Sequence, residues 1–196
     1  MSAPSDGPPS GPRPTPRQRV YRPRVVDQEL HDRLRSRGAV VIEGAKACGK
    51  TATAMQRAAS VVRLDVDAGA RRAAEIDAAL VLDGPTPRLL DEWQTVPTLW
   101  NHVRRAVDDR ALPGQFILTG SATPADDITR HTGAGRLSRL RMRTMSCFET
   151  GHATGMVSLQ ALFDGEPARS PETALTVPDI AMRVAVGGWP GHLTLP

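Results

Sequence analysis

The sequence predicts a three-layer α/β domain with a mainly parallel β-sheet. A glycine-rich loop lies between a β-branched run and a helix-forming segment, and apolar runs then alternate with helix-forming segments along the chain. Hydrophobic residues make up 40% of the 196 residues, whereas aromatic residues make up only 4%. A core of Val, Leu, Ile and Ala suits a parallel sheet covered by helices better than an aromatic-rich β-sandwich.

The first 24 residues are expected to form a disordered arm, because a segment so rich in Pro, Ser and Gly cannot bury a core. The arm holds five arginines and one aspartate, a net charge that equals the formal charge of +4 for the whole chain. The rest of the chain is balanced, so nucleic acid is only a weakly supported partner. A plain solvated tail is the alternative. The domain itself is expected over residues 25–163.

The stretch GAKACGKT, Gly44 to Thr51, predicts a phosphate-binding loop of the Walker A type. In the pattern G-x-x-x-x-G-K-T, glycines let backbone N–H groups turn toward phosphate oxygens. A predicted strand at 38–43 precedes the loop, and a predicted helix at 51–59 follows it. Both lysines of the chain, Lys46 and Lys50, lie here, whereas the other 23 of its 25 basic residues are arginines.

Lys50 is expected to contact the β- and γ-phosphates, since a compact ammonium on a flexible stem fits this position better than a guanidinium fork. Thr51 would offer its hydroxyl to Mg²⁺. The alternative is a glycine-rich turn without a ligand. Cys48 could make the site sensitive to oxidation, although a small side chain that fills the loop is the favoured interpretation.

The segment RLLDEWQ, 88–94, predicts the second part of the site, of the Walker B type. A strand at 60–66, a helix at 70–80 and a turn with Pro85 and Pro87 precede it. The strand ends in two carboxylates at the carboxyl edge of the sheet, where Asp91 can bind Mg²⁺ and Glu92 can polarise the attacking water. The alternative is a solvated acidic pair.

The next helix and strand are predicted at 97–109 and 114–124. Trp93 and Trp100 are expected in the core. Thr119 and Ser121, at the tip of the strand, are both candidates to hydrogen-bond the γ-phosphate or the water, and a hydroxyl satisfied by the turn is the alternative.

An arginine cluster without acids follows, and it predicts a strand with one basic face around 139–144. Arg136 follows a flexible Gly-Ala-Gly and could supply positive charge to a γ-phosphate in its own subunit or a neighbour's. Otherwise the cluster is a solvated or partner-facing surface, or a patch that binds anions. A short helix is predicted at 158–163, and the Pro-rich and acidic residues 164–176 predict a linker after it.

These motifs together carry a resemblance. The order VVIEGAKACGKT, RLLDEWQ, LTGSATP and GAGRLSRLRMRTMSCFETG resembles the ATPase domain of a group of bacterial AAA-type P-loop ATPases, in which a helical segment and a nuclease-like domain of unknown function usually follow. The resemblance covers roughly 22–191. It implies an AAA-like P-loop NTPase fold, a γ-phosphate sensor role for Ser121, and a match of Arg136 to the Gly-Arg position of the group. The chain matches the ATPase part only, so the resemblance implies that residues 164–196 form a linker and the start of a truncated helical lid.

The predicted site residues follow from the motifs and the resemblance. The catalytic candidates are Glu92, Lys50 and Arg136, and the metal ligands are Thr51 and Asp91. The predicted nucleotide-binding residues are Gly44, Ala47, Cys48, Gly49, Lys50, Thr51, Ala52 and Ser121.

The expected function is ATP binding with Mg²⁺ and hydrolysis of ATP. A nucleotide-binding switch or assembly module without turnover is the first alternative, and a small-molecule P-loop kinase is the second. A homo-oligomer or another protein is expected as partner. Two cysteines are too few for a disulfide framework, and no apolar run reaches the ~18 residues of a membrane span, so we expect a cytoplasmic protein.

Overall fold

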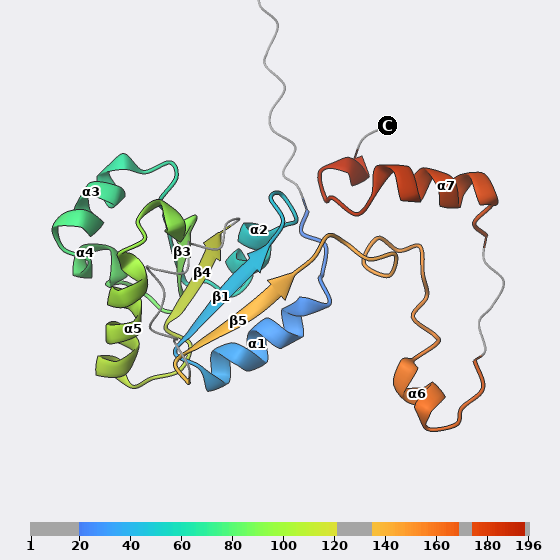
Figure 1. Ribbon diagram of the computed structural model, residues 1–196, viewed down its shortest axis with the longest axis horizontal. Helices are drawn as coiled ribbons and strands as arrows, with labels where there is room; N and C mark the ends of the chain where they lie inside the picture. Colours follow the sequence, from blue (N-terminus) through green and yellow to red (C-terminus); the bar gives the residue numbers. More distant parts are fainter. Residues whose placement is uncertain (1–19, 121–134, 169–173, 195–196) are drawn as a thin grey trace, which may run out of the picture.

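A five-stranded parallel sheet forms the centre of the protein in the computed structural model, which describes residues 20–120, 135–168 and 174–194 (Figure 1). The strand order is β2-β3-β4-β1-β5. The strands are β1 (Ala39–Gly44), β2 (Ser60–Arg63), β3 (Arg88–Asp91), β4 (Phe116–Gly120) and β5 (Leu137–Met142). The predicted three-layer α/β fold with a parallel sheet is confirmed.

Helices cover both faces of this sheet, and two more helices follow it (Figure 1). The described helices are α1 (Val26–Ser36), α2 (Lys50–Met55), α3 (Ala68–Ile76), α4 (Ala79–Leu82), α5 (Leu99–Arg110), α6 (Leu159–Phe163) and α7 (Val177–Val186), with 3-10 turns at η1 (Trp93–Thr95) and η2 (His192–Thr194). In Figure 1, α6 and α7 lie apart from the sheet and its covering helices. No helix in the described part of the chain is long and apolar enough to cross a membrane.

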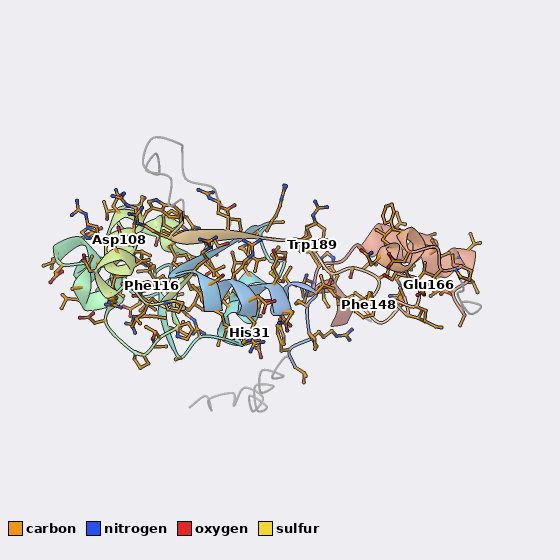
Figure 2. The ribbon with its side chains drawn as sticks, turned by 90° about the horizontal axis from the view of Figure 1, so that it is seen from below. His31, Asp108, Phe116, Phe148, Glu166 and Trp189 are labelled. Atoms are coloured by element: carbon orange, nitrogen blue, oxygen red, sulfur yellow. The ribbon has the colours of Figure 1, made fainter. Side chains whose placement is uncertain are left out.

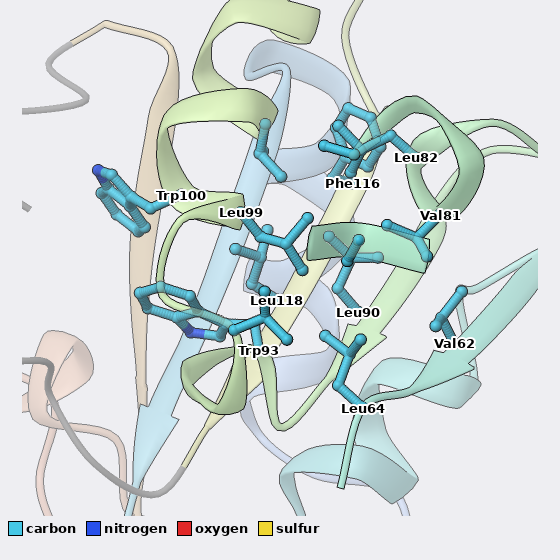
Figure 3. Close-up of a cluster of buried hydrophobic side chains, with 14 of the residues drawn as sticks. Val62, Leu64, Val81, Leu82, Leu90, Trp93, Leu99, Trp100, Phe116 and Leu118 are labelled. Atoms are coloured by element: carbon cyan, nitrogen blue, oxygen red, sulfur yellow. The ribbon is translucent and has the colours of Figure 1, made fainter. Parts of the chain in front are cut away.

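Alternate residues of the central strands β1, β3 and β4 supply two separate cores, because successive side chains of a strand point to opposite faces. On one face, Val40 and Ile42 of β1 pack with Leu30 of α1. On the other face, Val41 and Leu90 pack with residues of α3, α4 and α5 (Figure 3). Strands buried on both faces explain why the predicted strand segments are nearly continuous apolar runs.

The aromatic residues behave as predicted. Trp93 and Trp100 are each 2% exposed, and their ring centroids lie 5.2 Å apart within the α5-side core (Figure 3). Both indoles therefore anchor η1 and α5 to the sheet.

The helices differ from the prediction in several places. Helix α2 ends at Met55, whereas the predicted helix runs to residue 59. The predicted helix 70–80 is divided into α3 and α4, because Asp77 is extended (φ −151°) and its side chain accepts a hydrogen bond from the Ala79 N–H at 2.9 Å. Helix α1 lies where no helix is predicted above, although Leu30 and Leu34 stand four residues apart and both are buried. Acidic residues in its first turn and arginines in its last turn also suit a helix.

Candidate nucleotide-binding site

The phosphate-binding loop connects the end of β1 to the start of α2, and two glycines allow its path. Gly44 has φ 158°, and a Cβ there would lie 2.1 Å from the Met142 carbonyl oxygen. Gly49 has φ 108° and immediately precedes α2. Since backbone oxygen cannot move away cheaply, any side chain at Gly44 would separate β1 from the end of β5.

Lys50 is buried, with 5% of the residue exposed, and its ammonium turns back onto the loop. The Nζ atom donates to the carbonyl oxygens of Gly44 and Ala45, each at 2.9 Å. Two backbone carbonyls are modest partners for a buried charge. A phosphate oxygen would be a stronger acceptor for the same ammonium.

Thr51, Asp91 and Thr119 converge at the carboxyl edge of the sheet. The hydroxyls of Thr51 and Thr119 both donate to Oδ1 of Asp91, at 2.7 and 2.5 Å. Asp91 pairs with Thr119 in the β3–β4 register, and both are buried. Asp91 and the hydroxyls of Thr51 and Thr119, which come from three separate motifs, are therefore in direct contact.

The oxygen atoms of Thr51 and Asp91 fit the ligand preference of Mg²⁺. The ion prefers oxygen ligands and is usually bound by one or two carboxylates together with substrate phosphates and waters. Within the described residues no group of three or more His, Cys, Asp or Glu side chains could hold a metal.

Glu92 adopts a left-handed conformation, with φ 54° and ψ 46°, directly after β3. Non-glycine residues in this region are strained and cluster at functional sites. The carboxylate accepts a short hydrogen bond from the Gln94 side-chain amide. A Cβ on Gly120 would lie 2.3 Å from Gln94 Oε1, so the DEWQ segment packs directly against the end of β4.

The other predicted loop residues have simpler environments. Cys48 is fully buried, and its Sγ lies 3.9 Å from the Met142 carbonyl oxygen, which agrees with a side chain that fills space. Ala47 has φ 62° and is exposed, as is Ala52 in the first turn of α2. Ser121 lies outside the described residues.

Arg136 lies at the amino end of β5 and away from the phosphate loop. Its carbonyl accepts a hydrogen bond from the N–H of Ala39, the first residue of β1, and its guanidinium forms an ion pair with Asp108 of α5. Figure 2 shows Asp108 and Trp189 at opposite ends of β5, and Trp189 contacts the loop. The structure therefore does not bring Arg136 to the loop of its own chain.

The basic face predicted for 139–144 is present on β5. Arg139 and Arg141 are exposed, whereas Leu140 and Met142 are buried. Arg141 and Arg143 line a hollow of about 610 Å³ that adjoins Gly44 at the start of the phosphate loop.

Arg24 is a site residue that the motifs do not indicate. It falls within the predicted arm, yet it is only 8% exposed and pairs with Glu149 at 2.9 Å. Its Nη1 donates to the carbonyl oxygen of Cys48 at 2.8 Å. Tyr21 also contacts the domain, where its hydroxyl donates to Asp27 at 2.6 Å and lies 3.1 Å from the Thr53 hydroxyl. Tyr21 and Arg24 thus contact the domain, and residues 1–19 lie outside the described part.

Burial and hydrogen bonds oppose each other at Glu149. Burial raises the pKa of its carboxyl, but hydrogen bonds from the N–H groups of Ser146 and Val25 and from the Arg24 side chain outweigh it. The pKa is therefore below its ordinary value. At Tyr21, burial and the bond to Asp27 raise the pKa to about 12, so the phenol stays protonated.

The C-terminal segment also reaches the loop. The indole N–H of Trp189 donates to the Lys46 carbonyl at 3.1 Å, and the Met145 N–H donates to the Gly188 carbonyl at 2.7 Å. A sequence motif gives no hint of these contacts, since they join residues more than 40 positions apart in the chain.

Comparison with known proteins agrees with this geometry. The model of a family described as AAA domain matches residues 36–151, more than half of the chain. The match runs from the end of α1 past β5, and it includes the phosphate loop, the Asp91 strand and the Thr119 strand. No curated protein matches the chain. The chain therefore belongs to the AAA domain family and carries the nucleotide-binding ATPase-type domain of that family.

Proposed function

We propose that the chain binds ATP together with Mg²⁺ at the phosphate loop and hydrolyses the γ-phosphate. The observation that carries this proposal is the contact between Thr51 and Asp91 beside the buried ammonium of Lys50. A loop lysine, a loop hydroxyl and a strand carboxylate in one place are the parts that P-loop ATPases use for phosphate and metal. A glycine-rich turn without a ligand would not require a lysine, a hydroxyl and a carboxylate in one place.

Each residue would have a separate role. Lys50 would leave the Gly44 and Ala45 carbonyls and donate to β- and γ-phosphate oxygens. Thr51 and Asp91 would hold the Mg²⁺, which supplies charge neutralisation to the phosphates when bound. Thr119 would keep the Asp91 carboxylate oriented by its hydrogen bond.

Glu92 would act on the attacking water. Its carboxylate would accept a proton from the water while the water oxygen bonds to the γ-phosphorus. The bond from the γ-phosphorus to the β–γ bridging oxygen would break, with ADP as the leaving group. For this step the Glu92 carboxylate would have to exchange its hydrogen bond with Gln94 for one with water.

That same hydrogen bond favours a second candidate function, a switch that binds ATP without turnover. If the Gln94 amide held Glu92 permanently, the water would lack its base. The segment after α7, whose Trp189 indole bonds the Lys46 carbonyl, would then respond to the bound nucleotide. Arg136 would contribute to hydrolysis only in a homo-oligomer, at the site of a neighbouring subunit, because it lies far along β5 from its own loop.

The experiment that separates these functions is phosphate release by the full chain with Mg²⁺ and ATP, run beside direct ATP-binding measurements. For an ATPase, Glu92→Gln is expected to bind ATP normally while turnover falls about 100-fold or more. Lys50→Ala is expected to lose binding itself. ATP binding without phosphate release by the parent chain would support the switch, and absence of binding would refute both.

A further inference from the structure

Arg24 makes three contacts that no loop motif predicts. Its guanidinium donates to the Cys48 carbonyl at 2.8 Å through Nη1, to the Arg143 carbonyl at 2.8 Å through Nη2, and to Glu149 at 2.9 Å through Nε. Its side chain is 5% exposed. One buried side chain therefore joins the phosphate loop, the segment after β5 and Glu149 at the end of the 146–149 turn.

The contact with Cys48 fixes the orientation of one peptide group. The Cys48–Gly49 peptide is trans, because the cis bond of the described chain is at Thr86–Pro87. In a trans peptide the C=O and N–H bonds point in opposite directions. Since the Cys48 carbonyl points at Arg24, the Gly49 N–H points away from it.

Steric evidence places the guanidinium against the loop itself. A Cβ on Gly49 would lie 3.0 Å from Nη1 of Arg24 and 3.4 Å from Cε of Met142. Gly49 also has a backbone conformation that favours glycine. The glycine of the motif therefore lies directly against the guanidinium of an arginine outside it.

Glu149 is the charge partner of Arg24, with Oε1 2.9 Å from its Nε. Its carboxylate also accepts hydrogen bonds from the Val25 N–H at 2.9 Å and the Ser146 N–H at 2.7 Å, and its side chain is only 3% exposed. Because this carboxylate neutralises the guanidinium, Arg24 adds little net charge to the loop. Its effect on a bound ligand would therefore come from the orientation that it gives to the Cys48–Gly49 peptide.

We infer that Arg24 is a positioning residue for the phosphate loop: it holds the Cys48–Gly49 peptide so that the Gly49 N–H is turned toward the phosphates of a bound nucleotide. This inference rests on the proposed ATP site. Without Arg24 the peptide could rotate, and one donor of the loop would have to be reoriented at each binding event.

The test compares ATP affinity of the full chain for Arg24→Gln and for a matched arginine variant, Arg33→Gln. Arg33 also bonds a backbone carbonyl, that of Arg139 at 2.9 Å, and pairs with a glutamate, Glu29, but it does not contact the phosphate loop. Arg24→Gln is expected to raise the ATP Kd about tenfold or more, because it loses hydrogen bonds to a charged group. Arg33→Gln should leave the Kd within about twofold.

Two further variants separate positioning from a purely structural role. Glu149→Gln removes the charge partner but leaves the Arg24 bond to Cys48, so it should lower the denaturation midpoint while the ATP Kd changes less than about threefold. Arg24→Lys keeps the charge, but a single ammonium on a flexible stem cannot replace the rigid guanidinium fork that bonds two carbonyls and a carboxylate. This variant should therefore bind ATP several-fold more weakly than the parent. Arg24→Lys also serves if Arg24→Gln fails to fold.

The inference would be overturned if the Kd values of Arg24→Lys or folded Arg24→Gln equalled that of Arg33→Gln, or if Glu149→Gln lost as much affinity as Arg24→Gln. Those results would mean that Arg24 only stabilises the packing of the loop against the segment at 143–149. Lys50→Ala separates this failure from failure of the proposed function. If the parent binds ATP and Lys50→Ala does not, the ATP site stands whatever Arg24 does.

Discussion

Two buried cations contact the backbone of the phosphate loop, and their chemistry differs. Lys50 donates to two adjacent carbonyls of the loop itself, on a flexible stem that can exchange them for phosphate oxygens. Arg24 uses a rigid fork to join the Cys48 carbonyl to the Arg143 carbonyl, from a segment 95 positions further along the chain. Lys50 is therefore suited to move when a ligand binds, and Arg24 is suited to keep the loop in place.

At the level of single residues, Thr119→Val should weaken the response to Mg²⁺. The substitution removes a hydroxyl that donates to Asp91 at 2.5 Å and keeps the volume of the side chain. With one hydrogen bond fewer, the Asp91 carboxylate is less well oriented. A hydrogen bond to a charged group contributes about 1.5–3 kcal/mol to the stability of the arrangement. The Mg²⁺ concentration for half-maximal phosphate release is expected to rise about tenfold.

Ser60→Ala is a suitable control for Thr119→Val, because it removes a hydroxyl at the first residue of β2, at the other edge of the sheet. It should leave the Mg²⁺ requirement unchanged. An unchanged requirement in Thr119→Val as well would show that Asp91 needs no support from β4.

The Arg24–Glu149 pair should make stability depend on acidity. The pKa of Glu149 in the folded protein lies below its ordinary value of 4.5. The stabilisation is therefore complete above about pH 4.5 and is lost as the pH falls through the lower folded pKa. In urea unfolding measured from about pH 7 to pH 3, Glu149→Gln should show a smaller loss of midpoint than the parent.

Glu29→Gln is the matched control for this pH series. Glu29 pairs with Arg33 four residues away on α1, and its side chain is 49% exposed, so the pair contributes little. The pH profile of Glu29→Gln should follow the parent. If Glu149→Gln also followed it, the buried pair would contribute nothing to acid stability.

At the level of elements, helix α5 connects the core to the site. Leu99, Trp100 and Val103 are buried, and α5 follows directly after η1, which carries Trp93 and Gln94. Gln94 in turn contacts Glu92. The packing of α5 thus fixes the segment on which the predicted catalytic base stands.

Leu99→Ala should reduce the free energy of unfolding by about 2–5 kcal/mol, the usual cost of truncating a leucine that is fully buried. Guanidinium unfolding followed by circular dichroism would measure it. Leu80→Ala, on α4 at 61% exposure, removes the same atoms from the surface and should stay within about 0.5 kcal/mol. Equal effects of the two variants would mean that α5 is not held by its buried face.

At the level of the whole molecule, segments from both ends of the described chain meet at the phosphate loop. Residues 21–25 reach it through Arg24, whose guanidinium bonds the Cys48 carbonyl, and the segment after α7 reaches it through Trp189, whose indole bonds the Lys46 carbonyl (Figure 2). A rearrangement of the loop on nucleotide binding would therefore change the environment of the Trp189 indole.

Trp189 offers a direct optical test of this connection. It is 38% exposed, whereas Trp93 and Trp100 are each 2% exposed. Addition of ATP is expected to change the tryptophan emission of the parent chain, because the loop carbonyl that accepts the indole N–H moves. Trp189→Phe keeps the two buried indoles and should lose most of this change. An equal change in Trp189→Phe would show that the signal comes from the core and that the C-terminal segment does not follow the loop.

The parallel sheet, the phosphate loop and the Asp91–Glu92 pair could be predicted from the sequence, because each depends on local order: apolar runs, glycine spacing, and acids directly after a strand. Helix α1 had the same kind of local signal in Leu30 and Leu34. The place of Arg136 was not predictable, since it depends on which end of β5 lies beside the loop.

The sequence by itself determined which chemical groups the site contains, because the spacing of Gly44, Lys50 and Thr51 is a local property of the chain. Only the tertiary structure decided which distant groups support them. Thr119 reaches Asp91 through the β3–β4 register, and Arg24 reaches Cys48 and Glu149 across more than 20 and 120 positions. Such contacts depend on how strands are ordered and how segments fold back, and no short stretch of sequence encodes either.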